Sequence, residues 1–561
     1  MLPIEEVKEA KRRRLVVLSF WAVIILGIPL WWKTTEVYRA PLPFAEIEEW
    51  SHKTCDMRFP VHLRLHISDA TKDLDITGIG NSVKDGVAER LKSEEKCLEY
   101  EADVSVMAWN DAKQSESSTW LDEEDQDSEP GTYDLYVRPD VPVSRSKKFI
   151  DANRVFVGRG RRMLVLVKDW REDEISKVLS IYASSLFTKE RESIRRIIAE
   201  QRGEQTAANH DSMRTFKYSR EYRITFSLMN GGAGHVDWDI AKAVDVYLQP
   251  FLRELSVVSN FTVDSQIQHY ASLTVTPQHH QDGTSSYYYL TPEKLPHFVN
   301  AAEWNLASIV SSYPTINFVL YVASPEMRPL KIHDARGNII ESNAFSIPQW
   351  GGVVIANPAS SSKQENGYHF SPSELATPMS VFLTQLRDLM GVRDISAEIS
   401  DALGPSFMVD FAPAREKGLT ALELDALLRR RQAENLSSAL TTLRSLAQLV
   451  QNIPNMVVLS QIQAQVDEAL RSVRAAFDGR KRLVDTVRDS IVAVSTSEGA
   501  FFDPTMVAML YFPDEHKYAI YMPLFVPISV PLLGALRREL SERRKRKKSK
   551  EKGKEKDKKD Q

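Results

Sequence analysis

The sequence predicts a mixed α/β (α+β) domain that ends in long helices and is flanked by one membrane-spanning helix at each end of the chain. Three observations support this prediction. Residues 15–32 and 518–536 are apolar runs, each close to the roughly 20 residues that a helix needs to cross a bilayer. Apolar residues over about 55–370 alternate between the spacing of strands and that of helices, and 371–500 follow mainly helical spacing.

Both apolar runs have basic residues on their outer sides. Lys11–Arg14 precede the first run, and a Lys/Arg-rich tail follows the second. Because cationic flanks stay in the cytosol, we expect residues 1–14 and 537–561 to be cytosolic and residues 33–517 to be luminal. The first run has the composition of a signal peptide, but the bulky residues after it offer no small-residue cleavage site, which favours an uncleaved anchor.

The second run carries Pro523, Pro527 and Pro531. Their spacing of four places them on one helical face, and each leaves a carbonyl one turn earlier without its donor. Such prolines are tolerated where neighbouring helices or local backbone adjustment satisfy those carbonyls. The pattern favours packing of this face on other membrane helices in a multi-subunit complex; a kinked single anchor is the alternative.

The charge distribution agrees with this topology. The first 14 residues carry a net charge of +2 and residues 537–561 carry +8, so the remainder of a chain of net −4 carries −14. An acidic body argues against nucleic-acid binding. The tail either touches anionic lipid or is only solvated. Near its end, Lys558 and Lys559 resemble a dilysine retrieval signal, which predicts the endoplasmic reticulum membrane.

Four luminal residues are candidates for covalent modification. The chain has two cysteines, Cys55 and Cys97, and an oxidising lumen would permit a disulfide between them. Two cysteines are equally compatible with buried free thiols, so both alternatives stay open. Asn260 and Asn435 begin Asn-x-Ser/Thr sequons and are candidates for N-glycosylation.

The first part of the luminal body predicts alternating strands and helices. Phe59–Ile67 alternates strictly and predicts a half-buried strand. We then expect a helix near 83–91 and strands near 104–106 and 133–137, with an exposed acidic loop at about 115–131 between these strands. A hairpin of 155–157 with 163–167 should follow, and then a helix over 175–186.

A second round follows in a similar order. We expect a strand over 222–228, a helix over 240–248 capped by Asp237 and bent or ended by Pro250, and strands over 261–273, 317–323 and 344–356. No clean sequence repeat links the two rounds, so a duplicated module stays open. The glycines at 351–352 indicate a bulge or a close backbone approach, with Trp350 in the core favoured over a partner contact.

The last part of the body predicts long helices. One runs over 373–390 and ends at Gly391, and a second runs over 419–450. After Pro454, apolar residues at alternating spacings of three and four predict a single long helix over 458–494. These two long helices would form an antiparallel pair against the sheet.

No constellation for catalysis, metal binding or cofactor binding is found. His279, His280 and Asp282 form the densest ligand-like group, but they follow Pro277 in an expected polar loop without metal-site spacing. The Gly-rich turn at 230–234, before a predicted helix, is too weak a signal for a phosphate site. Neither cysteine has the context of a nucleophile. We therefore expect no catalytic residues, no metal and no cofactor.

Short motifs along the whole chain resemble the PIG-S family, a subunit of the glycosylphosphatidylinositol (GPI) transamidase of the endoplasmic reticulum. They are WKTT at 32–35, YRAPLP at 38–43, WDI at 238–240, PFL at 250–252, DSQ at 264–266, NFVLY at 317–321, FSIPQWGG at 345–352, FFDP at 501–504 and YFPDEHK at 511–517. Each motif is short, but together, in order and between two anchors, they are specific.

The resemblance implies an accessory, non-catalytic subunit. The transamidase replaces the C-terminal signal of a precursor protein with a preformed GPI anchor, and in this family the cysteine–histidine chemistry belongs to the caspase-like PIG-K subunit. The implied partners are PIG-K, PIG-T, PIG-U and the GAA subunit. Two other classes are alternatives: a membrane-anchored luminal enzyme that modifies glycans, and a scaffold or cargo adaptor without a transamidase link.

Overall fold

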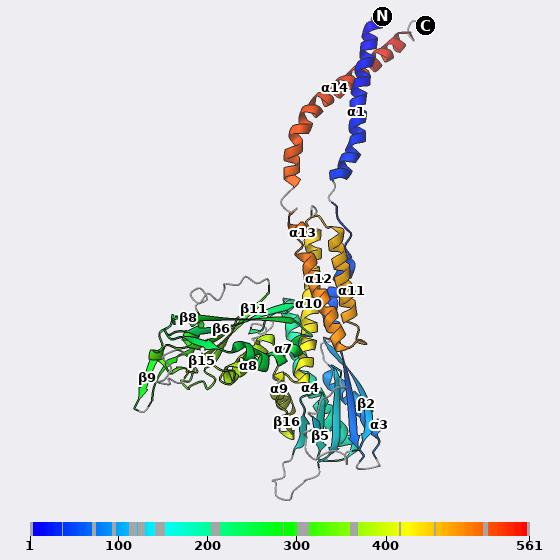
Figure 1. Cartoon of the computed structure of the whole chain (residues 1–561). Coiled ribbons are helices and arrows are strands. Elements are labelled where there is room, and N and C mark those ends of the chain that lie inside the picture. Colours follow the sequence, from blue (N-terminus) through cyan, green and yellow to red (C-terminus); the bar gives the residue numbers. More distant parts are fainter. Residues whose placement is uncertain are drawn as a thin grey trace. The chain divides into compact units, whose positions relative to one another are not determined.

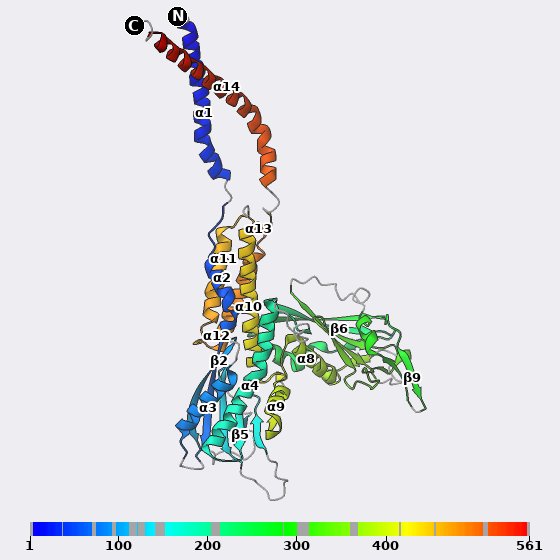
Figure 2. The same cartoon turned by 180° about the vertical axis from the view of Figure 1, so that it is seen from behind.

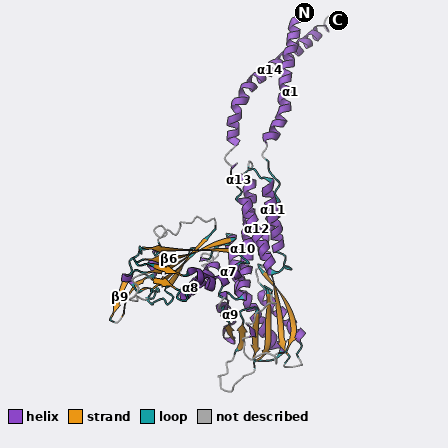
Figure 3. Ribbon diagram, viewed as in Figure 1, coloured by secondary structure: helices purple, strands orange, loops and turns teal. Residues whose placement is uncertain are grey.

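The computed structural model describes residues 4–35, 38–69, 74–92, 97–110, 120–121, 129–140, 152–203, 214–283, 285–299, 313–358, 368–414, 417–453, 456–508 and 514–557. The contacts divide the chain into two compact units. The larger unit comprises residues 45–442 and 468–496, and the other comprises 1–44, 443–467 and 497–561. The predicted mixed α/β class with long C-terminal helices is confirmed (Figure 3).

The larger unit begins with an α/β module, which we call the first module (residues 58–201). Its elements are β1 (Arg58–Ser68), α3 (Ile76–Leu91), β2 (Glu99–Trp109), β3 (Thr132–Pro139), β4 (Asn153–Val157), β5 (Arg162–Val167) and α4 (Glu172–Gln201). The sheet order is β2-β1-β3-β5-β4, extended at the β4 edge by β16 (Phe407–Phe411). Neighbours are parallel except β4 and β5, which form the predicted hairpin.

Helices α3 and α4 cover one face of this sheet, side by side (Figures 1 and 2). The strand pattern dictates this layer, because the alternate residues of β1 from Phe59 to Ile67 are all buried. They pack against the apolar stripes of α3, which includes Val83 and Val87, and of α4, which includes Ile175 and Leu179. Asp75 caps α3 by accepting a hydrogen bond from the Gly78 N–H at 3.0 Å.

A second module (residues 221–390) follows. Its principal elements are β6 (Glu221–Asn230), α6 (Ile240–Ala243), η4 (Val244–Leu248), α7 (Gln249–Leu255), β8 (Asn260–His269), β11 (Thr315–Val322), β13 (Ala344–Ile347), β14 (Gly351–Ala356) and α8 (Ala376–Met390). The sheet order is β8-β6-β11-β14-β13. All neighbours are parallel except the β13–β14 hairpin.

The two modules therefore have the same topology. In each, a central strand (β1 or β6) leads through a helical segment to a parallel edge strand (β2 or β8). A third strand (β3 or β11) then lies on the other side of the central strand, and a hairpin and a long helix complete the layer. The duplication that the sequence left open is present in the fold.

The second module has insertions that the first lacks in the described residues. Strands β9 (Gln278–Asp282), β10 (Ser285–Leu290) and β12 (Leu330–Ile332) form a small sheet, with η5 (Pro292–His297) after β10 and η6 (Pro325–Met327) before β12. Their apolar side chains, including Leu290 and Ile332, pack with Val319, Tyr321 and Ile355 on the face opposite the helices. Strands β7 (Val236–Trp238) and β15 (Tyr368–Phe370) pair separately.

Several predicted elements differ from the structure. The predicted strand 344–356 is the β13–β14 hairpin, because Pro348 and Gly351 lie at its turn. Gly351 also makes the predicted close backbone approach, since a Cβ on this residue would stand 1.8 Å from the Asn317 carbonyl oxygen. Trp350 is partly buried. Asp237 lies in β7 and not at a helix cap, since α6 begins after Asp239.

The π-helical segment η4 precedes Pro250, which stands in the first turn of α7, so the helix continues past the proline with a local irregularity. The predicted polar loop at 279–282 is strand β9, and the Gly-rich turn at 230–234 leads into β7 and not into a helix. The acidic loop predicted at about 115–131 lies mostly outside the described residues.

The helical region also differs in one respect. α8 ends at Gly391 as predicted, where the glycine has a φ of 75°. α9 (Ile395–Leu403) and η7 (Gly404–Ser406) lead to β16, and α10 (Ala421–Asn452) matches the second predicted helix. The predicted helix 458–494 is two helices, α11 (Ser460–Ala476) and α12 (Leu483–Phe501), with a polar turn at 477–482 between them.

The smaller unit contains the chain ends. α1 (Ile4–Thr35) and α14 (Asp514–Asp557) each include an apolar stretch long enough to cross a membrane, within Lys11–Leu30 and Ala519–Lys545. Arg13 pairs with Glu542 at 2.8 Å and Arg14 with Glu539, at the charged ends of these two ranges. The short helices α2 (Phe44–His52), η1 (Lys53–Asp56) and α13 (Pro504–Ala508) complete the described elements of the chain.

Candidate functional site

Neither cysteine is available as a nucleophile. The structure joins Cys55, just before β1, to Cys97, just before β2, in a disulfide with Cα atoms 4.4 Å apart. A nucleophilic cysteine needs a free thiolate. Within the described ranges, no group of three or more His, Cys, Asp or Glu side chains is placed to hold a metal ion.

The histidines at 279–280 do not form a ligand group. They are consecutive residues of β9, so their side chains point to opposite faces of the strand. His279 contacts Ser286 at 3.0 Å and the ring of Tyr288, and His280 packs on the ring of Tyr287. Asp282 is exposed at the end of the strand.

The two sequons have different environments. Asn260 is exposed as the first residue of β8, where its backbone N–H bonds to the Arg220 carbonyl. Asn435 is 1% exposed inside α10, and its Nδ2 donates to the Ser490 hydroxyl at 3.3 Å. This packing leaves no room for a glycan and contradicts the prediction that Asn435 accepts one.

The most distinctive chemistry is a set of buried charges on α10 that the sequence analysis did not foresee. Arg429 donates to both carboxylate oxygens of Glu190 at 2.5 and 2.9 Å and to the Tyr133 hydroxyl at 2.9 Å. The Tyr100 hydroxyl donates to Glu190 at 2.8 Å. All four groups are buried. α10 is therefore bonded directly to α4 and β3 of the first module, and to β2 only through Glu190.

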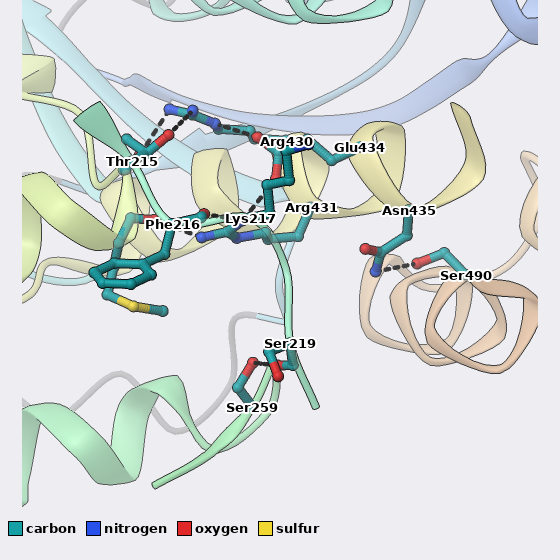
Figure 4. A network of polar contacts seen from close by, with 12 residues as sticks. Thr215, Phe216, Lys217, Ser219, Ser259, Arg430, Arg431, Glu434, Asn435 and Ser490 are labelled. Atoms are coloured by element: carbon teal, nitrogen blue, oxygen red, sulfur yellow. Dashed lines mark hydrogen bonds and ion pairs between the residues drawn. The ribbon is translucent and has the colours of Figure 1, made fainter. Parts of the chain in front are cut away.

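The next two arginines face the second module. Arg430 Nη1 donates to the Gly391 carbonyl at 3.1 Å, and Arg431 Nη2 donates to the Met390 carbonyl at 2.8 Å. Figure 4 shows both arginines with Phe216 and Glu434. Arg431 also reaches the Phe216 carbonyl at 3.3 Å. Glu434 accepts from Arg430 at 2.8 Å and from Arg431 at 2.7 Å. α10 is thus bonded to the end of α8 and to the segment before β6.

Two further carboxylates near the start of α10 are held in the same way. Asp425 is fully buried and accepts from the Gly131 N–H at 3.0 Å and from Arg161 at 2.6 and 2.9 Å. Glu423 pairs with Arg387 at 2.6 Å and accepts from the Thr420 N–H at 2.8 Å. Thr420 and Glu423 form a capping box, a start signal that is legible in the sequence.

The pKa shifts of these buried groups on and around α10 indicate a structural role. Burial opposes charge on Arg429, but the Glu190 carboxylate outweighs it and holds the pKa of Arg429 above its usual value. Burial would raise the pKa of Glu434, but Arg431 and Arg430 lower it overall. Burial, with Glu190 beside it, raises the pKa of Tyr100. These groups stay in one protonation state near neutral pH, so they are not suited to proton transfer.

A cavity of about 530 Å³ lies between α3 and α4. Its lining includes Ser82, Gly86 and Ser180, with Glu89 and Arg90. Lys177 and Ser176 also line it, and no histidine or cysteine is among the lining residues. Cys55, Cys97, His279 and His280 do not line this cavity.

The remaining candidate residues lie at the chain ends. Pro523, Pro527 and Pro531 are inside α14, where they are exposed within this chain. Lys558 and Lys559 lie outside the described residues.

Comparisons with known proteins agree on one family. The family model for "PIG-S: Phosphatidylinositol-glycan biosynthesis class S protein" matches residues 18–546. The bovine "GPI-anchor transamidase component PIGS" is 35% identical over 544 residues, which cover 93% of each chain. The human protein of that name is 35% identical over 540 residues, covering 92% of this chain and 93% of the relative. The "GPI transamidase component PIG-S homolog" of Schizosaccharomyces pombe is 28% identical over 534 residues, covering 92% and 82%.

Proposed function

Because the chain belongs to the PIG-S family, we propose that it is an accessory subunit of the GPI transamidase. That enzyme attaches a preformed GPI anchor to precursor proteins in place of their C-terminal signal. The observation that carries the proposal is the match along nearly the whole chain, both apolar ends included, to relatives named as components of this transamidase.

The proposal assigns no catalytic residue to this chain. The disulfide between Cys55 and Cys97 supports it, since both cysteines of the chain are consumed. The buried charges support it as well, because Glu190, Asp425 and Glu434 are each bound by arginine and closed to a substrate. The catalytic cysteine is then expected in the caspase-like PIG-K subunit.

We propose the following topology and domain limits. Residues 1–14 and 537–561 are cytosolic, 15–32 and 518–536 span the membrane of the endoplasmic reticulum, and 33–517 are luminal. The ion pairs of Arg13 and Arg14 with Glu542 and Glu539 support placing both ends on one side. The disulfide supports an oxidising compartment for the body, and the exposed Asn260 is the proposed glycosylation site.

The first experiment is an affinity purification of the full chain in mild detergent with mass spectrometry. PIG-K, PIG-T, PIG-U and the GAA subunit should be recovered in stoichiometric amounts. Recovery of the chain alone, or with unrelated trafficking proteins, would overturn the proposed function.

A second experiment tests the proposed role of the proline face. Replacing Pro523, Pro527 and Pro531 by leucine should reduce co-purified subunits several-fold, because the backbone shape that fits partner helices is lost. The control is Phe525→Leu with Ser529→Leu, which changes the opposite face of α14 and should leave recovery unchanged. Equal recovery from both variants would exclude a packing role for the prolines.

A further inference from the structure

The end of the luminal body nearest the membrane helices has an unusual surface. We call it the tip; it consists of residues 38–44, the described residues of 449–459 and residues 497–508, all in the smaller unit. The N-terminal segment pairs with the chain before α11: the Val458 N–H donates to the Tyr38 carbonyl at 3.3 Å, and the Ala40 N–H donates to the Val458 carbonyl at 2.8 Å.

Short connections hold the tip close to both membrane helices. α1 ends at Thr35, so Tyr38 lies three residues further and at most about 11 Å away along an extended chain. On the other side, α13 ends at Ala508 and α14 begins at Asp514, a span of at most about 22 Å. These lengths limit how far the tip can stand from the bilayer surface.

One segment of the tip is also depleted of charge. The 22 residues 445–466, from the end of α10 into α11, contain no Asp, Glu, Lys or Arg. The chain as a whole is 26% charged, so about six charged residues would be expected in such a stretch. Water-exposed connections between helices do not need this composition, whereas contact with the acyl boundary of a bilayer disfavours charge.

Two large aromatic side chains protrude from the tip, whose other two segments carry Arg39, Glu498 and Asp503. Phe502 is 70% exposed and Tyr38 is 60% exposed. Phe502 follows α12, and its ring meets that of Phe501 edge-on with centroids 5.0 Å apart. Exposed aromatic rings at the end of a membrane-tethered domain match the composition of the interfacial belts of membrane proteins.

We propose that the tip rests in the headgroup layer of the luminal leaflet, with Phe502 and Tyr38 inserted as interfacial anchors. The occupant is the lipid surface, because the tethers place the tip beside it and because exposed aromatic rings next to the charge-free stretch 445–466 suit the interface of a bilayer. Such contact would fix the height of the body above the membrane. This inference rests on the membrane anchoring in the proposed function.

The test uses spin labels on the full chain in phosphatidylcholine nanodiscs. Both native cysteines are in the disulfide, so Phe502→Cys or Tyr38→Cys provides one free thiol. Collision rates with oxygen and with a water-soluble nickel complex report depth. The ratio of oxygen to nickel accessibility at both positions should be several-fold higher than at the control Tyr270→Cys, which is 72% exposed on the second module.

A label at Leu26→Cys, within the apolar part of α1, tests membrane anchoring separately from the lipid contact of the tip. If the ratio of oxygen to nickel accessibility is high at Leu26 but the ratios at Phe502 and Tyr38 equal that at Tyr270, the lipid contact of the tip is excluded and membrane anchoring stands. If Leu26 also matches Tyr270, anchoring and the inference both fail. If the tip labels are water-exposed in the isolated chain and become shielded only in the assembled complex, the occupant is a partner subunit and the proposed lipid contact is wrong.

Discussion

The two modules share one topology but differ in what covers the second face of the sheet. In the second module, Val319, Tyr321 and Ile355 on that face are buried beneath the module's own β9, β10 and β12. In the first module, the corresponding face carries the polar trio of Arg64, His66 and Asp134, together with a small apolar cluster around Trp120. One sheet face is completed by an insertion, whereas the other stays polar.

The modules also differ in how they are joined to α10. The first is joined by two ion pairs, Arg429 with Glu190 and Arg161 with Asp425. The second is joined by one ion pair, Arg387 with Glu423, and by arginine bonds to the backbone carbonyls of Met390 and Gly391. The two modules therefore share a fold although their contacts with α10 differ. The difference implies that the loss of one carboxylate has different consequences in the two modules.

The largest effect is expected for Glu190→Gln. The change leaves the Arg429 cation buried without its counter-charge, which costs about 3–5 kcal/mol. The double variant Glu190→Gln with Arg429→Met should recover much of the loss, because no lone charge remains. Thermal unfolding of the full chain in detergent, followed by tryptophan fluorescence, measures both.

The matched variant for the second module is Glu434→Gln. Arg430 and Arg431 lose their shared counter-charge but keep their carbonyl partners, so the loss should be smaller than for Glu190→Gln, about 1.5–3 kcal/mol. Equal losses for Glu190→Gln and Glu434→Gln would mean that the two attachments do not differ in kind.

The disulfide offers a second way to compare the stability of the two modules, since Cys55 and Cys97 lie just before strands β1 and β2 of the first module. Cys55→Ser with Cys97→Ser opens a loop of 42 residues and should cost about 3–4 kcal/mol by the chain-entropy estimate. Hydrogen exchange should accelerate in β1 and β2 and stay unchanged in β6 and β8. Faster exchange in both sheets would show that the modules unfold as one unit.

The third prediction compares the second faces directly. Val319→Asp places a carboxylate under β10 and β12 at a fully buried position and should cost about 3 kcal/mol. Tyr136→Asp, on the half-open face of the first module, should cost about 1–2 kcal/mol, since water can reach the new charge. The same thermal measurement applies, and a larger loss at Tyr136 would contradict the contrast between covered and open faces.

Much of this fold is legible in the sequence, and the failures have physical causes. The β4–β5 hairpin and the end of α8 at Gly391 were predicted because alternation and glycine chemistry are local signals. The break between α11 and α12 was missed because Leu483 follows Ala476 by seven residues, so the apolar stripe keeps its phase across the turn. Asp478 and Gly479 were the turn signal.

The buried charges could not be read in the same way. Charged residues are normally assigned to the surface, and nothing local shows that Arg429, Arg430 and Arg431 face three different sets of partners. Consecutive helical residues point about 100° apart, so burial of all three requires protein around most of the helix. Three adjacent arginines between Leu428 and Leu436 were the only signal.

The smallest predicted effect concerns the open face of the first module. Burial favours a raised pKa for Asp134, but the hydrogen bond from His66 at 2.8 Å and the charge of Arg64 at 2.6 Å lower it overall. A lowered pKa in the folded state stabilises the fold above the ordinary value of about 3.9, and this stabilisation is lost as the pH falls through the folded value.

The Asp134→Asn variant should therefore unfold at a lower temperature than the unmodified chain at pH 7. The gap between the two unfolding temperatures should narrow steadily below about pH 4. Other carboxylates titrate equally in both proteins, so the difference between them isolates Asp134. A gap that stays constant down to pH 3 would mean that the Arg64–Asp134–His66 trio holds the strands by shape alone, and that the open face has no electrostatic role in stability.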